Sequence, residues 1–146
     1  MAALLRAAVR DDIPQIQRVR HAVRENRLTS GVITDDEVRE HLEVLGRGWV
    51  VELDGTVRAF AIANRRTANV WALFVEPGHE RCGLGRRLHD AMMAWFWAEG
   101  VPRVWLSTGA CTRAEAFYRA AGWRQAGLTA HGEVRFEMER PGSAPT

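Results

Sequence analysis

Two glycines only two positions apart, together with several arginines, make residues 76–88, EPGHERCGLGRRL, the first place to look for chemistry in this 146-residue chain. Gly83 and Gly85 allow the backbone to approach a bound group closely, because neither carries a Cβ atom. An apolar run precedes the segment and a helical pattern follows it, so the loop leads into a helix N-terminus. Free backbone N–H groups and the helix dipole favour an anion there, and Arg81 and Arg86 add positive charge. The segment is therefore either a plain glycine-rich turn or a phosphate-binding loop.

The composition excludes several related kinds of site. All twenty basic residues are arginine, and without lysine there is no Walker-type phosphate loop, Schiff base or lysine general base. A dinucleotide fingerprint needs a third glycine where Leu88 stands. The formal charge of +2 does not predict a nucleic-acid-binding face. Cys82 and Cys111 are too few for a disulfide framework and lack metal-ligand spacing, so we expect no metal.

The elements that position this loop follow from periodicity, caps and turns. Apolar or alternating runs predict strands at 4–9, 48–53, 57–64, 69–75, 103–108 and 132–139, with one or two strands at the end, and 3.6-residue periodicity predicts helices at 12–23, 34–45, 84–99 and 112–121. Thr34–Glu37 (TDDE) and Thr112–Glu115 (TRAE) have the pattern of capping boxes. Asp54-Gly55 indicates a hairpin turn, and Gly122 indicates a helix end. This order predicts a mixed α/β domain.

The second half of the chain resembles the GNAT N-acetyltransferase superfamily. The resemblance rests on VWALFVEPGHERCGLGRRLHDAM and VWLSTGACTRAEAFYRAAGW, within residues 70–123. It implies an α/β fold with about seven mostly antiparallel strands, a splayed central pair and about four helices. We expect one such domain over residues 1–140, with a disordered tail at 141–146. The resemblance also implies that the phosphate at the glycine loop belongs to acetyl-CoA.

Site residues follow from the same resemblance. The implied cofactor-binding residues are Leu73, Phe74 and Val75 in the strand, Arg81, Cys82, Gly83, Leu84, Gly85 and Arg86 in the loop, and Cys111, Ala114 and Phe117 in and before the next helix. Tyr118, the only tyrosine, falls on the family's general acid, which protonates the coenzyme A sulfur. Its alternative interpretation is a core aromatic packed with Phe117. Two residues depart from the family pattern: Glu80 stands in place of Gln or Arg, and Cys111 in place of an Asn.

The implied activity is transfer of the acetyl group of acetyl-CoA to a primary amine, by direct attack in a ternary complex. The alternative is a non-catalytic acyl-CoA-binding or regulatory module. The general base stays open among Glu76, His79, Glu80, Glu25 and water. Glu25, Asn26 and Arg27 lie where the family builds its acceptor pocket, although they also fit a hydrophilic helix end.

The N-terminal residues contain no apolar core long enough for a signal peptide, and no window approaches a membrane span. We therefore expect a cytoplasmic protein with free thiols. The expected partners are acetyl-CoA and an amine acceptor, without nucleic acid or membrane, and the family also implies a homodimer as one form of assembly.

Overall fold

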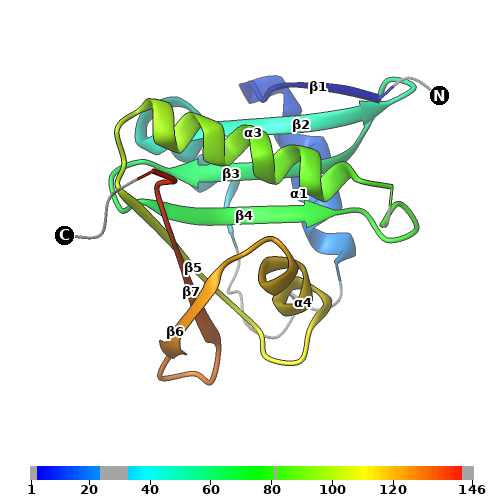
Figure 1. Cartoon of the computed structure of the whole chain (residues 1–146). Helices are drawn as coiled ribbons and strands as arrows, with labels where there is room; N and C mark the ends of the chain where they lie inside the picture. Colours follow the sequence, from blue (N-terminus) through cyan, green and yellow to red (C-terminus); the bar gives the residue numbers. More distant parts are fainter. Residues whose placement is uncertain (1–2, 24–32, 81, 143–146) are drawn as a thin grey trace.

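One sheet of seven strands with helices on both faces forms the fold (Figure 1). The computed structural model describes residues 3–23, 33–80 and 82–142. The strands are β1 (Ala3–Ala7), β2 (Gly46–Leu53), β3 (Thr56–Asn64), β4 (Asn69–Val75), β5 (Arg103–Thr108), β6 (Arg124–Leu128) and β7 (Val134–Glu139). The helices are η1 (Arg10–Asp12), α1 (Ile13–Ala22), α2 (Asp35–Glu40) with its π-helical continuation η3 (His41–Leu45), α3 (Leu84–Ala98) and α4 (Arg113–Ala120). The predicted fold class and element order are confirmed.

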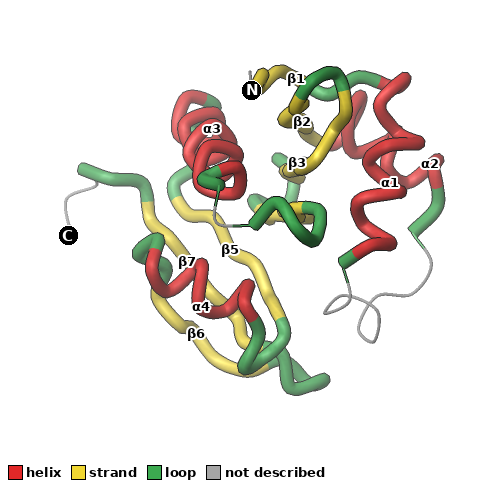
Figure 2. Tube along the Cα trace, turned by 90° about the vertical axis from the view of Figure 1, so that its right-hand side faces the viewer, coloured by secondary structure: helices red, strands yellow, loops and turns green. Residues whose placement is uncertain are grey.

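The strands lie in the order β1-β2-β3-β4-β5-β7-β6, and β4 and β5 are the parallel neighbours. Leu88 of α3 and Tyr118 of α4 share the core on one face with Phe136 of β7. Ile16 of α1 belongs to the core on the other face, together with Phe60 of β3. Figure 2 shows α3 and α1 on opposite sides of the strands. A group bound at the central strands therefore meets different side chains on each face.

Short-range signals predict two connections correctly. Asp54 and Gly55 both have positive φ, 51° and 84°, and form the turn between β2 and β3. Thr34 Oγ1 accepts the N–H of Glu37 at 3.1 Å, and Glu37 Oε1 accepts the N–H of Thr34 at 3.1 Å, so the first capping box is complete. These contacts join residues at most three positions apart.

In the described ranges, no helix has the length and apolar character needed to cross a membrane.

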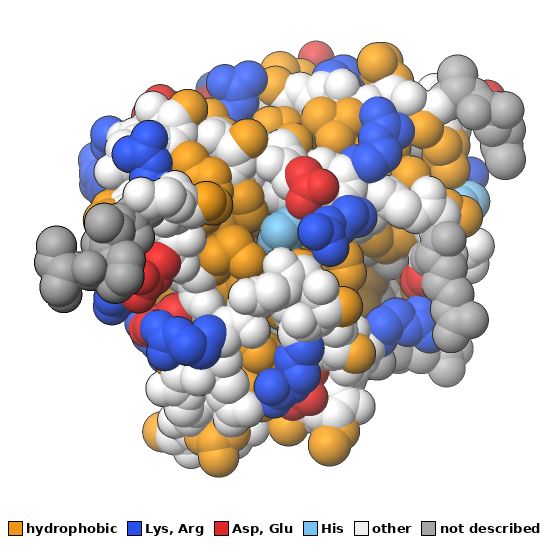
Figure 3. Space-filling view, in the orientation of Figure 1, with side chains coloured by type: hydrophobic (Ala, Val, Ile, Leu, Met, Phe, Trp, Pro, Cys, Tyr) orange, Lys and Arg blue, Asp and Glu red, His pale blue; other side chains and the backbone are white. Residues whose placement is uncertain are grey.

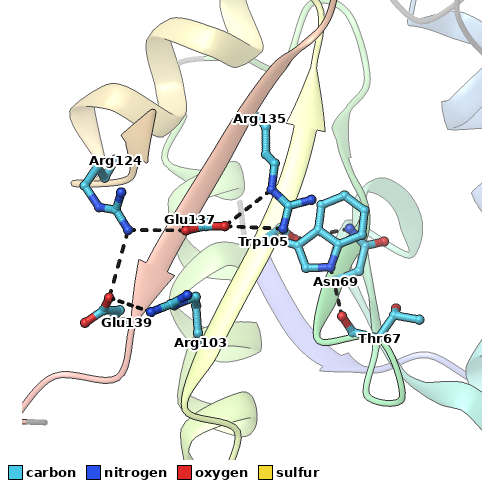
Figure 4. A network of polar contacts seen from close by, with 8 residues as sticks. All are labelled: Thr67, Asn69, Arg103, Trp105, Arg124, Arg135, Glu137 and Glu139. Atoms are coloured by element: carbon cyan, nitrogen blue, oxygen red, sulfur yellow. Dashed lines mark hydrogen bonds and ion pairs between the residues drawn. The ribbon is translucent and has the colours of Figure 1, made fainter. Parts of the chain in front are cut away.

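Trp105 joins the two halves of the sheet at one end (Figure 4). Its indole N–H donates to the Thr67 carbonyl at 2.8 Å, and the Asn69 side-chain amide donates to the Trp105 carbonyl at 3.2 Å. Arg135 of β7 lies over the indole, with Cζ 4.4 Å from the ring centroid. Glu137 holds Arg135 in place at 3.3 Å. The sheet is therefore held together where β4 begins, which fixes the direction in which its central strands can separate.

An ion pair between β1 and the start of α1 fixes the helix on the second face. Asp12, 5% exposed, accepts hydrogen bonds from Arg6 Nη1 and Nη2 at 2.8 and 2.7 Å and from the Val9 N–H at 2.8 Å. The hydrogen bonds from Arg6 hold the pKa of Asp12 below its ordinary value, against the opposing effect of burial. The pair therefore stabilises the fold when the carboxyl group is ionised.

Asp12→Asn is expected to lower the free energy of unfolding by about 2–3 kcal/mol at pH 7, because an amide cannot replace the two ionic hydrogen bonds. Since the folded-state pKa is lowered, this stabilisation is present above the unfolded pKa of about 3.9 and is lost as pH falls through the folded pKa. The Tm difference from wild type should therefore shrink below about pH 4. Thermal unfolding at pH 7 and pH 3 measures it, with exposed Asp11→Asn as control. A difference that stays constant between the two pH values contradicts the prediction.

Candidate active site

The central strands separate after a single residue pair, and this opens a wedge in the sheet. In the described part of the chain, β4 and β5 pair only at Asn69 and Trp105, although β4 continues to Val75. Figure 1 shows the two strands leaving this point in different directions, with α4 beside the wide end. The wedge matters chemically because paired strands satisfy each other's backbone groups, whereas the later part of β4 has lost its neighbour on this side.

The backbone of β4 shows which residues face the wedge. The N–H of Glu76 donates to the Arg58 carbonyl of β3 at 2.7 Å. Backbone polar groups of successive strand residues point to alternate sides, so Phe74 also faces β3, and Leu73 and Val75 face the wedge. Their N–H and C=O groups can therefore bind an extended ligand as a strand would.

The glycine loop and the next two helices meet at this point. Gly83 precedes α3 with φ of 79°, a left-handed conformation that favours glycine, and no described side chain caps the helix. A Cβ on Gly85 would lie 3.5 Å from Val75 Cγ2 and 3.6 Å from Phe117 Cε1. Hydrogen-bonded turns of α3 begin with the Arg87 N–H, which donates to the Gly83 carbonyl at 3.1 Å. The preceding N–H groups are thus available to an anion.

Glu80 is compensated within the loop. Its carboxylate accepts the Gly78 N–H at 2.6 Å and pairs with Arg113 of α4 at 2.6 Å. Backbone N–H groups of Glu80 itself and of Gly78, followed by Arg113, lower the pKa of Glu80. Figure 3 shows basic side chains, all arginine in this sequence, around the hydrophobic surface on this face. The departure at Glu80 therefore leaves the loop without an uncompensated negative charge.

Tyr118 lies in the core beside the wedge. It is 5% exposed, and its ring centroid is 5.6 Å from that of Trp123 and 5.2 Å from that of Phe117. Trp123 reaches it because α4 ends in a Schellman turn, with Gly122 at φ 97° and the Trp123 N–H donating to the Tyr118 carbonyl at 3.0 Å. Burial raises the pKa of Tyr118. The surroundings of Tyr118 are therefore those of a core aromatic residue. Its neighbour Phe117 is the residue that lies against the glycine loop.

The start of α4 corrects one prediction. Thr112 Oγ1 accepts the Glu115 N–H at 3.2 Å, as expected. The reciprocal half of the TRAE box is replaced, because the Glu115 carboxylate pairs with Arg119 one turn later at 3.5 Å. Cys111, just before this cap, is exposed and has φ of 60°. A left-handed backbone is one that Asn tolerates better than Cys, which gives a conformational reason for the family's Asn at this position.

Cys111→Asn is expected to raise the free energy of unfolding by about 0.5–1 kcal/mol, because it relieves part of the cost of the left-handed backbone. Thermal unfolding measures the change. Cys82→Asn is the matched control, since Cys82 is also an exposed free thiol but its φ is not positive. An equal effect at both cysteines would show that the backbone conformation is not the cause.

The remaining predicted residues divide into three groups. Leu84 is 3% exposed, so it can serve a ligand only through its backbone N–H. Cys82 is exposed, and Ala114 is half-buried against the core shared by α3 and α4. Arg81, Glu25, Asn26 and Arg27 lie outside the described residues. Across residues 3–23, 33–80 and 82–142, no group of three or more His, Cys, Asp or Glu side chains is arranged to hold a metal ion.

Glu76 is poorly suited to be the general base. Its carboxylate, at the end of β4, forms ion pairs with Arg18 and with Arg58, the latter at 2.5 Å. Burial raises the pKa of Glu76, but the hydrogen bonds from Arg18 and Arg58 outweigh it, and the net shift is downward. His79 Nε2 lies 3.6 Å from the same carboxylate. Of the described candidates for the general base, His79 is thus the one that is not a carboxylate held by arginine.

Sequence reasoning missed a residue on the opposite face. Arg20 of α1 is 6% exposed and lies among Phe60, Trp71 and Phe74. The signal was present, because Arg20 follows Ile16 by four residues and therefore occupies the apolar stripe of its helix. Because arginine is rarely buried without a partner, a buried arginine in such a stripe needs an explanation of its own.

Comparison with known proteins gives a consistent result. A family model described as acetyltransferase (GNAT) family matches residues 10–123. No curated protein matches the chain. Solved structures similar to it include the ribosomal-protein-S18-alanine N-acetyltransferase from Escherichia coli, with 19% identity, 99% of each chain covered and a TM-score of 0.75. PaiA N-acetyltransferase from Thermoplasma acidophilum in complex with coenzyme A has 12% identity, covers 96% of this chain and 100% of its own, and has a TM-score of 0.81. A phosphinothricin acetyltransferase from Sinorhizobium meliloti in complex with AcCoA has 20% identity, covers 100% and 94%, and has a TM-score of 0.79. At these identities the structural likeness concerns the fold.

Proposed function

The chain belongs to the acetyltransferase (GNAT) family, and we propose that it transfers the acetyl group of acetyl-CoA to a primary amine by direct attack in a ternary complex. The observation that carries this proposal is the wedge: β4 and β5 pair at Asn69 and Trp105 and then separate beside a helix that begins at a left-handed glycine. A strand edge and a helix N-terminus side by side can hold an extended arm and a phosphate at once.

The residues present fit coenzyme A. The N–H groups of residues 83–86 would bind the pyrophosphate, with Arg86 adding charge. The wedge-facing backbone of Leu73 and Val75 would bind the pantetheine arm. A methyl group on Gly85 would already touch Val75 and Phe117, so a larger side chain would fill the gap between strand and helix. Glycine at this position keeps that gap available.

In the transfer, the amine nitrogen bonds to the acetyl carbon, the carbon–sulfur bond breaks, and the sulfur gains a proton to leave as a thiol. Acetyl-CoA supplies the activated acyl group, and the protein supplies position. An alkylammonium of pKa ~10.4 must first lose a proton, which costs about 4.6 kcal/mol at pH 7. Because the carboxylates of Glu76 and Glu80 are held by arginines, we assign this proton to His79 or to water. Tyr118 is the proposed donor to the sulfur.

We also propose that residues 1–140 act as one catalytic domain. β1 begins at Ala3 and β7 ends at Glu139, and both belong to the same sheet. Removing β1 would expose β2, and removing β7 would expose both β5 and β6, which pair with it.

Calorimetric titration with acetyl-CoA, followed by mass spectrometry of acetylated amines, tests the proposed function. Mass spectrometry is preferable to a thiol reagent because Cys82 and Cys111 are exposed and free. We expect micromolar acetyl-CoA binding and acetylation of at least one class of primary amine. Binding without transfer to any amine would support the non-catalytic module instead, and absence of binding would remove both.

A further inference from the structure

Arg20 is a buried cation, and two of its nitrogens have no hydrogen-bond partner among the described residues. Its side chain is 6% exposed, and Cζ lies 5.6, 5.1 and 5.3 Å from the ring centroids of Phe60, Trp71 and Phe74. Nε and Nη2 are both buried, and within residues 3–23, 33–80 and 82–142 neither has an acceptor at hydrogen-bonding distance. Burying a charge without a hydrogen-bonded counter-ion is strongly unfavourable. If this position had only a packing role, an apolar residue of the same length would make the fold more stable than arginine does.

The two unpaired nitrogens form one recognition edge. In a guanidinium group, the N–H of Nε and one N–H of Nη2 point in the same direction, and together they match the two oxygens of a carboxylate. The aromatic rings around Arg20 contribute cation–π attraction but no hydrogen-bond acceptor. The side chain therefore has a free fork of the shape that binds a planar anion.

The acidic and polar side chains near Arg20 make their hydrogen bonds to other residues. Glu37, whose charge acts on Arg20, accepts the Thr34 N–H and hydroxyl at 3.1 and 3.2 Å in the helix cap. Gln17, one turn earlier on α1, donates from Nε2 to the Ile33 carbonyl at 2.8 Å, which orients its amide and leaves Oε1 buried without a partner. Although burial lowers the pKa of Arg20 to about 10, the group is charged at neutral pH. Among the described residues, the Arg20 guanidinium thus has no hydrogen-bonded counter-ion.

A β-bulge places Trp71 against this site. The register of β4 against β3 shifts at this point, so that Trp71 is left without a partner on β3. Trp71 and Ala72 consequently both pack on the face that carries α1, instead of alternating. Trp71 also stacks on His41 of η3, with ring centroids 3.6 Å apart and planes 9° from parallel. Bulges that redirect a side chain are frequent next to active sites.

The position of Phe74 connects Arg20 with the wedge. Phe74 packs on the α1 face, and its neighbours Leu73 and Val75 are the residues whose backbone faces the wedge. Arg20 therefore lies behind the strand proposed to hold the thioester, on the face opposite α3. The coenzyme A phosphates belong to the α3 side, so an anion at Arg20 would come from the other substrate.

We propose that the Nε and Nη2 groups of Arg20 bind a carboxylate of the acceptor, so that the enzyme acetylates an amine that also carries a carboxylate, such as an amino acid. The acceptor role rests on the proposed function, whereas carboxylate binding at Arg20 does not. The site offers one guanidinium, and the negative charge of Glu37 nearby repels anions more strongly the higher their charge, which favours a carboxylate over a phosphate dianion. Trp71 and Phe74, which are partly buried, would contact an apolar substituent of the same molecule.

Carboxylate binding can be measured without knowing the acceptor. We would record Tm with saturating acetate, propionate, benzoate and phenylacetate, each beside its carboxamide, and with inorganic phosphate. At least one carboxylate should raise Tm by about 3 °C or more, with no effect of its amide. Arg20→Met should abolish this shift and, because it removes an unpaired buried charge, should raise the ligand-free Tm by a few degrees. Arg39→Met, at an exposed arginine of α2, should keep the shift. Equal effects of acids and amides, or stabilisation by phosphate alone, would overturn the proposal.

Acetylation assays test the acceptor role. Wild type should prefer amino acids over their carboxamides by about 100-fold or more in kcat/KM. Arg20→Met should reduce this preference to near one, and Arg20→Lys, which keeps the charge but loses the fork, should fall between them. The Kd for acetyl-CoA should change less than twofold in both variants. Rapid acetylation of the amides would overturn the inference while the proposed function stands. Failure of acetyl-CoA binding would remove the proposed function and leave the carboxylate titration to decide on Arg20.

Discussion

Gly83→Glu is expected to weaken acetyl-CoA binding by at least about 100-fold. The substitution places a carboxylate at the N-terminus of α3, where the proposed pyrophosphate is bound, and like charges about 4 Å apart near a protein surface repel by about 4 kcal/mol. The backbone adds a second cost, because Gly83 has φ of 79° and an L-residue in the left-handed region is less stable by about 1–2 kcal/mol. Calorimetric titration of wild type and variant with acetyl-CoA measures the loss.

The chain offers a close control for this variant. Gly55 in the turn between β2 and β3 has φ of 84°, and a Cβ there, as at Gly83, would meet nothing within 4 Å. Gly55→Glu therefore adds the same charge under the same backbone strain, away from the wedge, and should leave acetyl-CoA affinity within about twofold. Gly83→Ala separates strain from charge and should lose less than about tenfold. Similar affinities for Gly83→Glu and Gly55→Glu would mean that the loop is only a turn.

Tyr118→Phe is expected to lower kcat by about 10- to 100-fold, at the low end of what an acid catalyst contributes, with little change in the Kd for acetyl-CoA. The modest size follows from proton affinities. A thiol has a pKa near 8.5 and leaves fairly well without help, and burial raises the pKa of Tyr118 above its ordinary value of 10.0. Full proton transfer to the sulfur is therefore uphill, and the phenol acts mainly as a hydrogen-bond donor as the sulfur leaves.

Stability measurements separate this role from packing. No hydrogen bond within the described residues involves the Tyr118 hydroxyl, so its removal leaves no buried partner unsatisfied. Phenylalanine should keep the contacts of the ring with Trp123 and Phe136, and we expect Tm to change by less than about 3 °C. A kcat equal to that of wild type would leave Tyr118 as a core residue only. A loss of kcat that accompanies a large fall in Tm would have to be attributed to the fold.

Local signals account for the parts of the fold that were predicted. Asp54-Gly55 specifies its turn because both residues accept positive φ, and Thr34 with Glu37 specifies a helix start because the two groups are three residues apart. Gly122 specifies a helix end in the same way. At TRAE the same pattern failed in part, because Arg119, a residue outside the motif, attracted the Glu115 carboxylate. Motifs of this kind are reliable as long as no competing partner lies within reach.

The order of the elements, the glycine loop before α3 and the resemblance to the GNAT family could all be predicted from the sequence. All of these depend on residues close together in the chain, whose interactions are the same in any tertiary context. Three features became visible only in the folded chain: β4 and β5 separate beyond Asn69, Arg113 compensates Glu80, and Arg20 lies behind Phe74 with two nitrogens unpaired among the described residues. Each of these features depends on contacts between residues far apart in sequence. Burial makes such contacts decisive, because the free energy of a charge removed from water depends almost entirely on the groups that the fold places around it.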